Sequence, residues 1–151
     1  MRDRSGGRSL ALFLFAILCG CQPGGGEDGI VTADDAEVFA MIVADETVRF
    51  TGTEPFWGGE VLGDQLRYSS MENPDGTRIT VGRFAGNNGL AYSGKLDGLA
   101  FDMTITPGRC SDGMSDRDYP FVVTLKLGEE TRSGCAWTDA APFSENPSPS
   151  A

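Results

Sequence analysis

From Thr47 onward, short runs of alternating apolar and polar residues are separated by turn residues about every eight to twelve positions. Alternation with a period of two places every second side chain on the same face of a β-strand. Tight turns between such runs join neighbouring strands in antiparallel order. The pattern therefore predicts an antiparallel meander, and it constrains the fold more than any other feature of the chain.

The turns give the expected boundaries of seven or eight strands. Asn73-Pro74-Asp75-Gly76 places proline and glycine where a type I turn uses them, and Asp97-Gly98 has the composition of a tight hairpin turn. The expected strands cover 48–51, 57–62, 65–68, 77–83, 90–96, 99–106, 121–127 and 131–137.

A sheet with one apolar face must cover that face, and about 100 residues are enough for a closed or nearly closed barrel. We therefore expect a mainly β fold, either a small antiparallel barrel or a strongly curled meander. A β-sandwich is the alternative, because alternation alone does not distinguish one closed sheet from two stacked sheets.

The segment before the first strand fits two structures. Asp34 and Glu37 have the spacing of a capping box, and the apolar residues that follow recur at helical spacing, so a short helix near 35–45 is expected. The run 37–43 fits a strand equally well.

The amino-terminal residues have the composition of a secretory signal peptide. Three arginines precede nine apolar residues at 10–18, which are too few to cross about 30 Å of hydrocarbon as a helix. The sequence Leu18-Cys19-Gly20-Cys21 resembles a bacterial lipobox, which implies cleavage after Gly20 and lipidation of Cys21. Gln22 stands where an aspartate would retain such a lipoprotein in the inner membrane, which favours the outer membrane, facing the periplasm.

Composition divides the chain into four parts. Residues 1–20 are the signal peptide, and 21–33 comprise the lipidated cysteine and a glycine-rich tether. Residues 34–139 form the β-domain, and 140–151 have the proline and serine content of a disordered tail.

The cysteines can all be assigned. Cleavage discards Cys19 and the lipid occupies Cys21, so Cys110 and Cys135 remain as a pair in an oxidising compartment. We expect a disulfide between them.

The chain contains no histidine and carries 22 Asp+Glu against 12 Lys+Arg, a net charge of −10. Without histidine, Ser-His-Asp and Cys-His nucleophile systems and HExxH zinc sites are excluded. The negative charge repels nucleic-acid phosphates, so no nucleic-acid partner is expected, whereas a basic protein is a suitable partner.

Two stretches combine acidic with aromatic residues, and the first is Gly52-Thr53-Glu54-Pro55-Phe56-Trp57. Pro55 cannot donate to a strand ladder and therefore marks an edge or a strand break. Glu54 beside two aromatic residues is a candidate general acid or ligand-binding group. The interpretation we favour is a structural corner, in which Glu54 accepts backbone N–H groups and the aromatic residues plug the barrel.

The second stretch is the segment 110–120, which begins at Cys110 and ends at Pro120. Its aspartates lack the spacing of an EF-hand loop, and neighbouring arginines would compete with a cation, so no metal or cofactor is expected. We expect a structural loop in which Asp112 or Asp116 caps backbone amides and pairs with an arginine, while Met114 fills a gap.

These two stretches resemble the motifs of a family of uncharacterised bacterial lipoproteins and exported proteins. That family carries GTEPFW near the start of the domain and C-x-DGMSDxxYP followed by GCA near its end, here Gly134-Cys135-Ala136. A more distant likeness is to META-domain lipoproteins and periplasmic inhibitors of c-type lysozyme, which share small β-rich folds and a cysteine pair. The resemblance implies a cell-envelope lipoprotein.

We expect no catalytic residue and no catalysis. The expected function is that of a lipid-anchored envelope β-domain, a binding or envelope-maintenance lipoprotein directed toward a basic protein such as a lysozyme-like hydrolase. The alternative is a carboxylate-dependent hydrolase that uses Glu54 with an aspartate of the 112–118 loop. The candidate binding or structural residues are Glu54, Phe56, Trp57, Asp112, Met114, Asp116, Arg117 and Tyr119.

Overall fold

The computed structural model describes residues 39–53 and 55–145, and within these ranges the chain forms strands and contains no helix. The signal peptide, Cys21, the tether and Glu54 lie outside the described residues. The strands are β1 (Val48–Gly52), β2 (Trp57–Leu62), β3 (Gln65–Ser70), β4 (Thr77–Ala85), β5 (Leu90–Leu96), β6 (Leu99–Ser111), β7 (Arg117–Leu127), β8 (Glu130–Trp137) and β9 (Ser144–Glu145).

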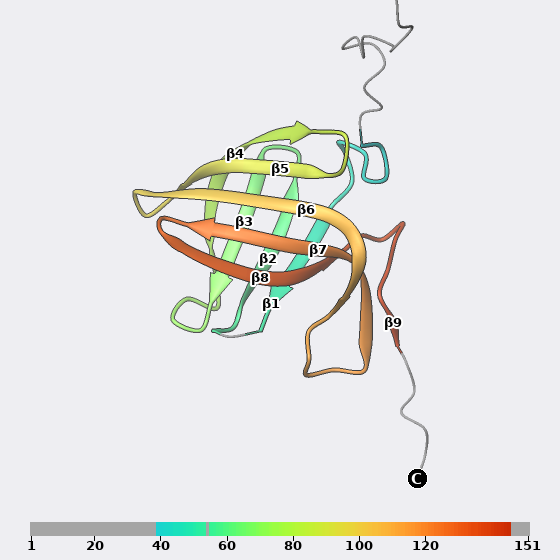
Figure 1. Ribbon diagram of the computed structural model, residues 1–151. Coiled ribbons are helices and arrows are strands. Elements are labelled where there is room, and N and C mark those ends of the chain that lie inside the picture. The colour runs from blue at the N-terminus through green and yellow to red at the C-terminus, as the bar shows by residue number, and fades with distance from the viewer. Residues whose placement is uncertain (1–38, 54, 146–151) are drawn as a thin grey trace, which may run out of the picture. The chain divides into compact units, whose positions relative to one another are not determined.

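Strands β1 to β8 close into one antiparallel barrel in which each strand pairs with its neighbours in the sequence (Figure 1). The first and last of these strands complete the ring, with Arg49 of β1 opposite Trp137 of β8. All eight belong to a single closed sheet, so the predicted barrel is confirmed and the sandwich alternative is wrong.

Because the strands alternate in direction, the barrel has two distinct ends. The connections β1–β2, β3–β4, β5–β6 and β7–β8 lie at one end, which we call the β1–β2 end. The connections β2–β3, β4–β5 and β6–β7 lie at the other, which we call the β6–β7 end.

The predicted turns form where their residues can adopt the backbone conformation that each turn requires. Asp97 and Gly98 have φ values of 50° and 83°, the left-handed pair that a tight hairpin between twisted strands requires. In the β3–β4 connection, Gly76 has a φ of 80° and its amide donates to the carbonyl of Asn73 at 3.2 Å. Six of the eight expected strands begin at the residue expected from these turns.

Side chains from every second strand position fill the barrel. An eight-stranded barrel leaves an interior that is just wide enough for side chains. The largest fully buried ones are Tyr92, Phe50, Phe101, Phe121, Ile42, Leu66, Leu90, Met103, Ile105, Leu125, Val48 and Val61. All but Ile42 lie on strands, as the alternating pattern requires.

Ile42 belongs to the segment for which a helix or a strand was expected, and the structure corrects both expectations for residues 39–46. This segment makes bends and a turn instead. Its Phe39 amide donates to the carbonyl of Gly86 at 2.8 Å, and Arg83 Nη2 donates to the carbonyl of Ile42 at 2.8 Å. Phe39 and Ile42 are buried in the core. Their helical spacing therefore marks the two residues through which this segment packs onto the β6–β7 end of the barrel.

Strands β6 and β7 run further than expected, to Ser111 and from Arg117. Their pairing shifts register between Pro107 and Cys110 and then continues as a hairpin beyond the barrel. A bulge of this kind bends the strand without ending the ladder. In Figure 1 the hairpin projects from the barrel beside β9.

The predicted disulfide between Cys110 and Cys135 is present, and it attaches the base of this hairpin to β8. The ordered domain also extends past residue 139, which corrects the expected boundary. Phe143 packs against Tyr119 and Trp137, and β9 pairs with β7. The expectation of a disordered tail over 140–151 is therefore wrong for residues 140–145.

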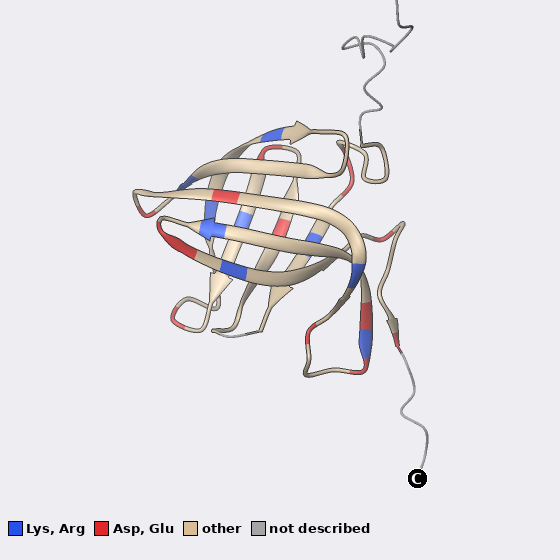
Figure 2. Cartoon of the chain, viewed as in Figure 1, with Lys and Arg blue, Asp and Glu red and all other residues tan. Residues whose placement is uncertain are grey.

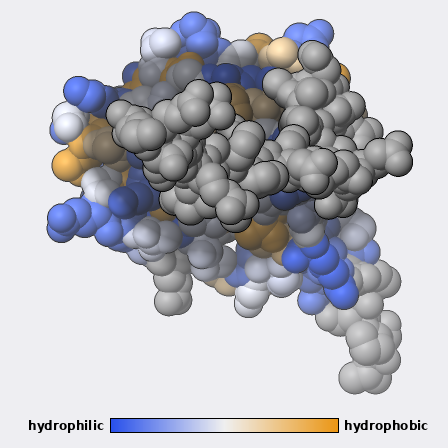
Figure 3. Space-filling model, turned by 45° about the horizontal axis from the view of Figure 1, so that its top comes forward, coloured by the Kyte–Doolittle hydropathy of each residue, from blue (hydrophilic) through white to orange (hydrophobic). Residues whose placement is uncertain are grey.

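The described surface is mixed in character. On the face drawn in Figure 3, hydrophobic areas outside the grey atoms are interspersed with hydrophilic ones. The exposed large apolar side chains of the described residues are Met41, Val43, Phe56, Leu62, Met71, Phe84, Leu99 and Met114. Two of them, Phe56 and Met71, line one hollow at the β1–β2 end.

Candidate functional site

The β1–β2 connection sends its two aromatic residues in opposite directions. Trp57 begins β2 and points into the barrel with only 4 % of its surface exposed, whereas Phe56 is 47 % exposed. The expectation that both aromatic residues plug the barrel is therefore right for Trp57 and wrong for Phe56. The role expected of Glu54 lies outside the described residues.

Trp57 is held in a stack of aromatic rings. Its ring lies 5.9 Å from that of Phe50 and 6.2 Å from that of Tyr68, and Tyr68 meets Phe101 edge-on at 5.9 Å. The indole also depends on Gly52, because a Cβ built at Gly52 would lie 1.9 Å from Trp57 Nε1. The glycine that starts the GTEPFW motif thus makes room for the tryptophan that ends it.

The indole N–H of Trp57 is an unusual feature of this packing. Trp57 Nε1 is buried and has no hydrogen-bond partner among residues 39–53 and 55–145. An unbonded buried donor costs free energy, and such groups are rare in folded proteins. The position of the indole is therefore determined by ring packing within the described part of the chain.

A hollow of about 300 Å³ lies over Trp57, between the β1–β2 and β3–β4 connections. Phe56 lines one part of it, and Met71, which is 66 % exposed, and Pro74 line another. The remaining lining residues are Thr51, Trp57, Gly58, Ser69 and Ser70. We call this hollow the Phe56–Met71 groove.

The β3–β4 connection carries two carboxylates that are next to groove residues in the sequence. Glu72 follows Met71, and Asp75 follows Pro74. Ser70 Oγ donates to Glu72 at 2.8 Å, and hydrogen bonds from its own backbone amide and from Ser70 lower the pKa of Glu72. The charged form of Glu72 is therefore favoured, and Glu72 directly follows Met71 in the chain.

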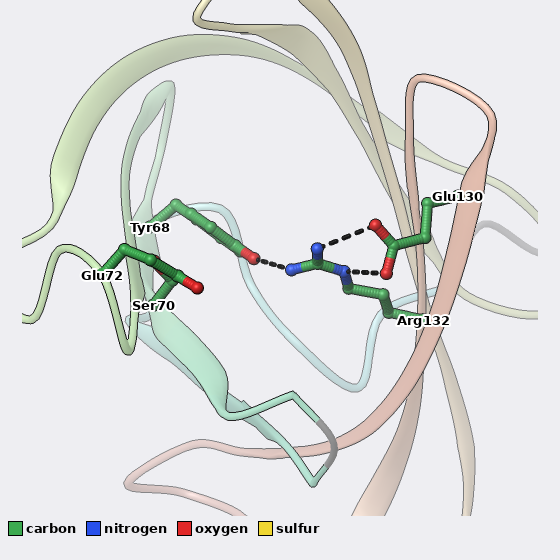
Figure 4. A network of polar contacts seen from close by, with 5 residues as sticks. All are labelled: Tyr68, Ser70, Glu72, Glu130 and Arg132. Carbon is green, nitrogen blue, oxygen red and sulfur yellow. Dashed lines mark hydrogen bonds and ion pairs between the residues drawn. The ribbon is translucent and has the colours of Figure 1, made fainter.

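A polar network links Tyr68, whose ring stacks on Trp57, to β8 (Figure 4). Arg132 Nη1 donates to the Tyr68 hydroxyl at 2.6 Å, and its Nε and Nη2 donate to Glu130, each at 2.9 Å. Arg132 occupies an inward position on β8, opposite the buried Leu125. It ties β8 to β3 across the barrel end.

The network shifts the titration of its members. Burial raises the pKa of Tyr68, although the Arg132 charge opposes that effect. The hydrogen bonds from Arg132 lower the pKa of Glu130, and Glu130 raises the pKa of Arg132. Tyr68 therefore keeps its proton and Glu130 its charge at neutral pH, and the network is an ion pair with a neutral hydroxyl.

The 110–120 hairpin is organised by one carboxylate. Asp112 accepts from the amides of Met114 and Ser115 at 3.0 and 2.8 Å, and from the hydroxyls of Ser115 and Tyr119 at 2.7 and 3.1 Å. Partial burial raises the pKa of Asp112, but these four hydrogen bonds outweigh it and lower the pKa to about 2. The structural capping role expected for Asp112 is confirmed.

A pairing of an aspartate with an arginine is seen in this segment at Asp118. Arg109 donates to both carboxylate oxygens of Asp118, at 2.9 and 2.6 Å. Asp116 lies in the turn between Asp112 and Asp118. Met114 is 62 % exposed, so the expectation that it fills a gap is wrong.

Tyr119 and Arg117 belong to an aromatic cluster at the base of the hairpin. The ring of Tyr119 lies 5.4 Å from that of Trp137 and 5.5 Å from that of Phe143. Arg117 lies over the Phe143 ring at 4.3 Å and pairs with Glu145 at 3.6 Å. These contacts attach β9 to the hairpin.

The two motifs belong to different connections of the barrel. The GTEPFW motif is at the β1–β2 end, and the 110–120 hairpin connects β6 to β7 at the other end. Asp112 is also ionised at neutral pH and therefore not a general acid there.

No group of three or more carboxylate or cysteine side chains in the part of the chain that the structure describes could hold a metal ion. The oxygens of Asp112 are already occupied by N–H and O–H donors.

Sequence reasoning missed Met71 and the three residues of the Tyr68 network. Arg132 had a readable signal, because it occupies an inward position of an alternating strand where an apolar residue is the rule. Met71 had none, since its place beside Phe56 follows from the register of β2 with β3, where Trp57 lies opposite Ser70.

Comparisons of the chain with protein-family models, with curated proteins and with solved structures found no match. Among the described residues, no helix has the length and apolar character needed to cross a membrane.

Proposed function

We propose that this chain is a non-catalytic binding domain of the bacterial cell envelope, which captures a basic protein through the Phe56–Met71 groove. The partner presents an apolar side chain to the groove and lysine or arginine side chains to the acids around it. A lysozyme-like hydrolase has this chemistry. Function as an envelope-maintenance lipoprotein is compatible with the same surface.

The observation that carries the proposal is the exposure of two large apolar side chains on neighbouring connections of a rigid barrel. Phe56 and Met71 face solvent around a hollow of about 300 Å³, and Glu72 and Asp75 follow the groove residues Met71 and Pro74 in the sequence. Exposed apolar groups that are rimmed by polar ones are typical of interaction sites. Complementary charge accelerates encounter and favours a basic partner over an acidic one.

The proposed place of action is the outer membrane, facing the periplasm, with the domain attached through a lipid on Cys21. The apolar run at 10–18 and the sequence LCGC support this attachment. The Cys110–Cys135 disulfide supports an oxidising compartment. Mass spectrometry of protein purified from membranes should show an amino terminus at acylated Cys21. An unmodified chain that begins at Met1 would contradict the anchor.

Binding is tested with two purified probes, a c-type lysozyme and a basic peptide that carries one phenylalanine. We expect saturable binding of both to the wild-type protein. The double variant Phe56→Ser, Met71→Ser should bind about tenfold more weakly. Glu72→Gln should weaken binding relative to the wild type, because it removes an attractive charge. This loss should be larger at low ionic strength, where screening is weaker.

Phe84→Ser is the matched control, because Phe84 is 69 % exposed on β4 and does not line the groove. Its binding and its melting temperature should equal those of the wild type. A wild-type protein that binds neither probe, or equal losses in the groove and control variants, would show that the proposal is wrong.

A further inference from the structure

A second hollow lies on the outer wall of the barrel, over β1 to β4, and differs in chemistry from the groove described above. Its volume is also about 300 Å³, and Arg49, Glu60, Arg67 and Arg78 line it together with Leu62 and Gln65. Three of the nine Lys and Arg residues in the described chain therefore meet at one place on an acidic protein.

The four charged residues form a single row across four strands. Arg49 lies opposite Glu60, Glu60 opposite Arg67, and Arg67 opposite Arg78. Figure 2 shows the row as blue and red segments that follow one another on β1 to β4. Strand register thus places charges in the order positive, negative, positive, positive.

The carboxylates nearby neutralise this row only in part, because they pair with two of its three arginines. Arg49 pairs with Asp139 at 2.7 Å, and Arg67 pairs with Glu60 at 3.3 Å. Arg78 is exposed and makes no hydrogen bond or ion pair with any described residue. Like charges directly opposite each other on neighbouring strands, with Cβ atoms about 5 Å apart, are destabilising. Arg67 and Arg78 are such a pair.

We propose that this hollow binds a small ligand through a phosphate monoester group, held between Arg67 and Arg78. A tetrahedral dianion accepts from two guanidinium forks at once and removes the repulsion between them. Gln65 supplies a neutral donor, and Leu62, which is 49 % exposed, supplies an apolar contact for the rest of the ligand. This inference does not rest on the proposed function.

The phosphate belongs either to a free metabolite or to a lipid headgroup, and two arms of the experiment distinguish them. The first arm titrates the full chain with phenyl phosphate and with inorganic phosphate at low ionic strength, followed by the arginine Nε–H resonances. The second measures capture of the protein by phosphatidylcholine vesicles with and without phosphatidic acid. Any contribution of the amino-terminal lipid is common to both vesicle types.

In the first arm, we expect saturable binding of phenyl phosphate, tighter than that of inorganic phosphate because of the contact with Leu62. Arg78→Gln should weaken it about tenfold. Glu60→Gln should tighten it about two- to threefold, because a competing carboxylate is removed from Arg67. The control is Lys95→Gln, an equal change of charge on β5 outside the hollow, which should leave affinity unchanged.

Arg78→Gln should fold normally, because Arg78 is exposed and its removal relieves repulsion from Arg67. Vesicle capture that requires both phosphatidic acid and Arg78 would support a lipid headgroup as the source. Phenyl phosphate binding without such capture would support a free phosphate ester. Absence of saturable phenyl phosphate binding, or equal losses in Arg78→Gln and Lys95→Gln, would overturn the proposal.

Discussion

Asp112 shows how one side chain determines the shape of a loop. Its two oxygens accept four hydrogen bonds from Met114, Ser115 and Tyr119, so a five-residue turn is closed around a single carboxylate. The pKa of Asp112 falls from its ordinary 3.8 to about 2 because these donors favour the charged form. The lowered pKa links the stability of the hairpin to pH.

A lowered pKa in the folded state means that the contribution of Asp112 to stability is present above pH 3.8 and is lost as pH falls through about 2. Asp112→Asn should therefore lower the free energy of unfolding by about 1 kcal/mol at pH 7, a modest value because the carboxylate is partly exposed. The difference should shrink toward zero near pH 2. Urea denaturation at several pH values measures it.

Asp75→Asn is the control for this measurement, because Asp75 is exposed and has no hydrogen bond or ion pair with any residue the structure describes. It should leave the free energy of unfolding unchanged at every pH. A difference for Asp112→Asn that does not depend on pH would contradict the explanation.

Gly52 offers a second test at the scale of one residue. Gly52→Ala should lower the free energy of unfolding by about 1–3 kcal/mol, because the new methyl group would lie 1.9 Å from Trp57 Nε1 and displace the indole. Gly82→Ala is the control, since its Cβ would meet only the Ser93 carbonyl, at 3.9 Å. Near-ultraviolet circular dichroism should change in the first variant alone. Equal stability of the two variants would refute the conclusion that Gly52 makes room for the Trp57 indole.

At the scale of elements, the sequence predicts those strands and turns that are determined by residues close to them in the chain. It does not predict those that depend on contacts with distant residues. The barrel strands were predictable because each is bounded by its own turn, as Asp97-Gly98 bounds β5 and β6. The extension of β6 past Pro107 was not, because proline and glycine there resemble a loop and only the partner strand β7 maintains the ladder. Within the described part of the helix expected near 35–45, residues 39–45 are not helical, and Phe39 and Ile42 are anchored there by tertiary contacts.

The candidate sites divide in the same way. The capping role of Asp112 is local to its loop and could be predicted from the segment itself. The pairing of Tyr68 with Arg132 joins β3 to β8, which are distant in sequence, and no spacing in the sequence encodes it. The Arg49–Glu60–Arg67–Arg78 row depends on the register of consecutive hairpins and emerges only when the three registers are combined.

The β6–β7 hairpin depends on one covalent bond. The Cys110–Cys135 disulfide spans 25 residues, for which the chain-entropy model gives about 3.5 kcal/mol. Reduction should lower the free energy of unfolding by about that amount. Hydrogen exchange should accelerate first at 110–119, beyond the register shift, while the amides of 101–106 stay protected. Uniform loss of protection would show that the hairpin and the barrel unfold together.

For the whole molecule, closure of the barrel also involves residues that belong to no strand. Residues 39–46 cover the β6–β7 end, with Phe39 and Ile42 in the core and Met41 and Val43 facing solvent. The core of this domain therefore continues into the segment that precedes β1.

Ile42→Ala should lower the free energy of unfolding by about 2–4 kcal/mol, because it leaves a cavity at the closed end of the barrel. Met41→Ala is the neighbouring control and should stay within about 0.5 kcal/mol of the wild type, since Met41 is 58 % exposed. Chemical denaturation of both variants measures the difference. Equal effects would mean that the segment does not seal the barrel.

The closed ring of strands has a consequence for how the chain reaches its native state. Seven of the eight pairings in the ring join strands that are adjacent in the sequence, and such hairpins form early because their loops are short. The seam between β1 and β8 alone must bring distant parts of the chain together. We expect folding to be limited by the closing of this seam, so that its small residues Gly52, Gly134 and Ala136 govern the speed of folding as much as the final stability.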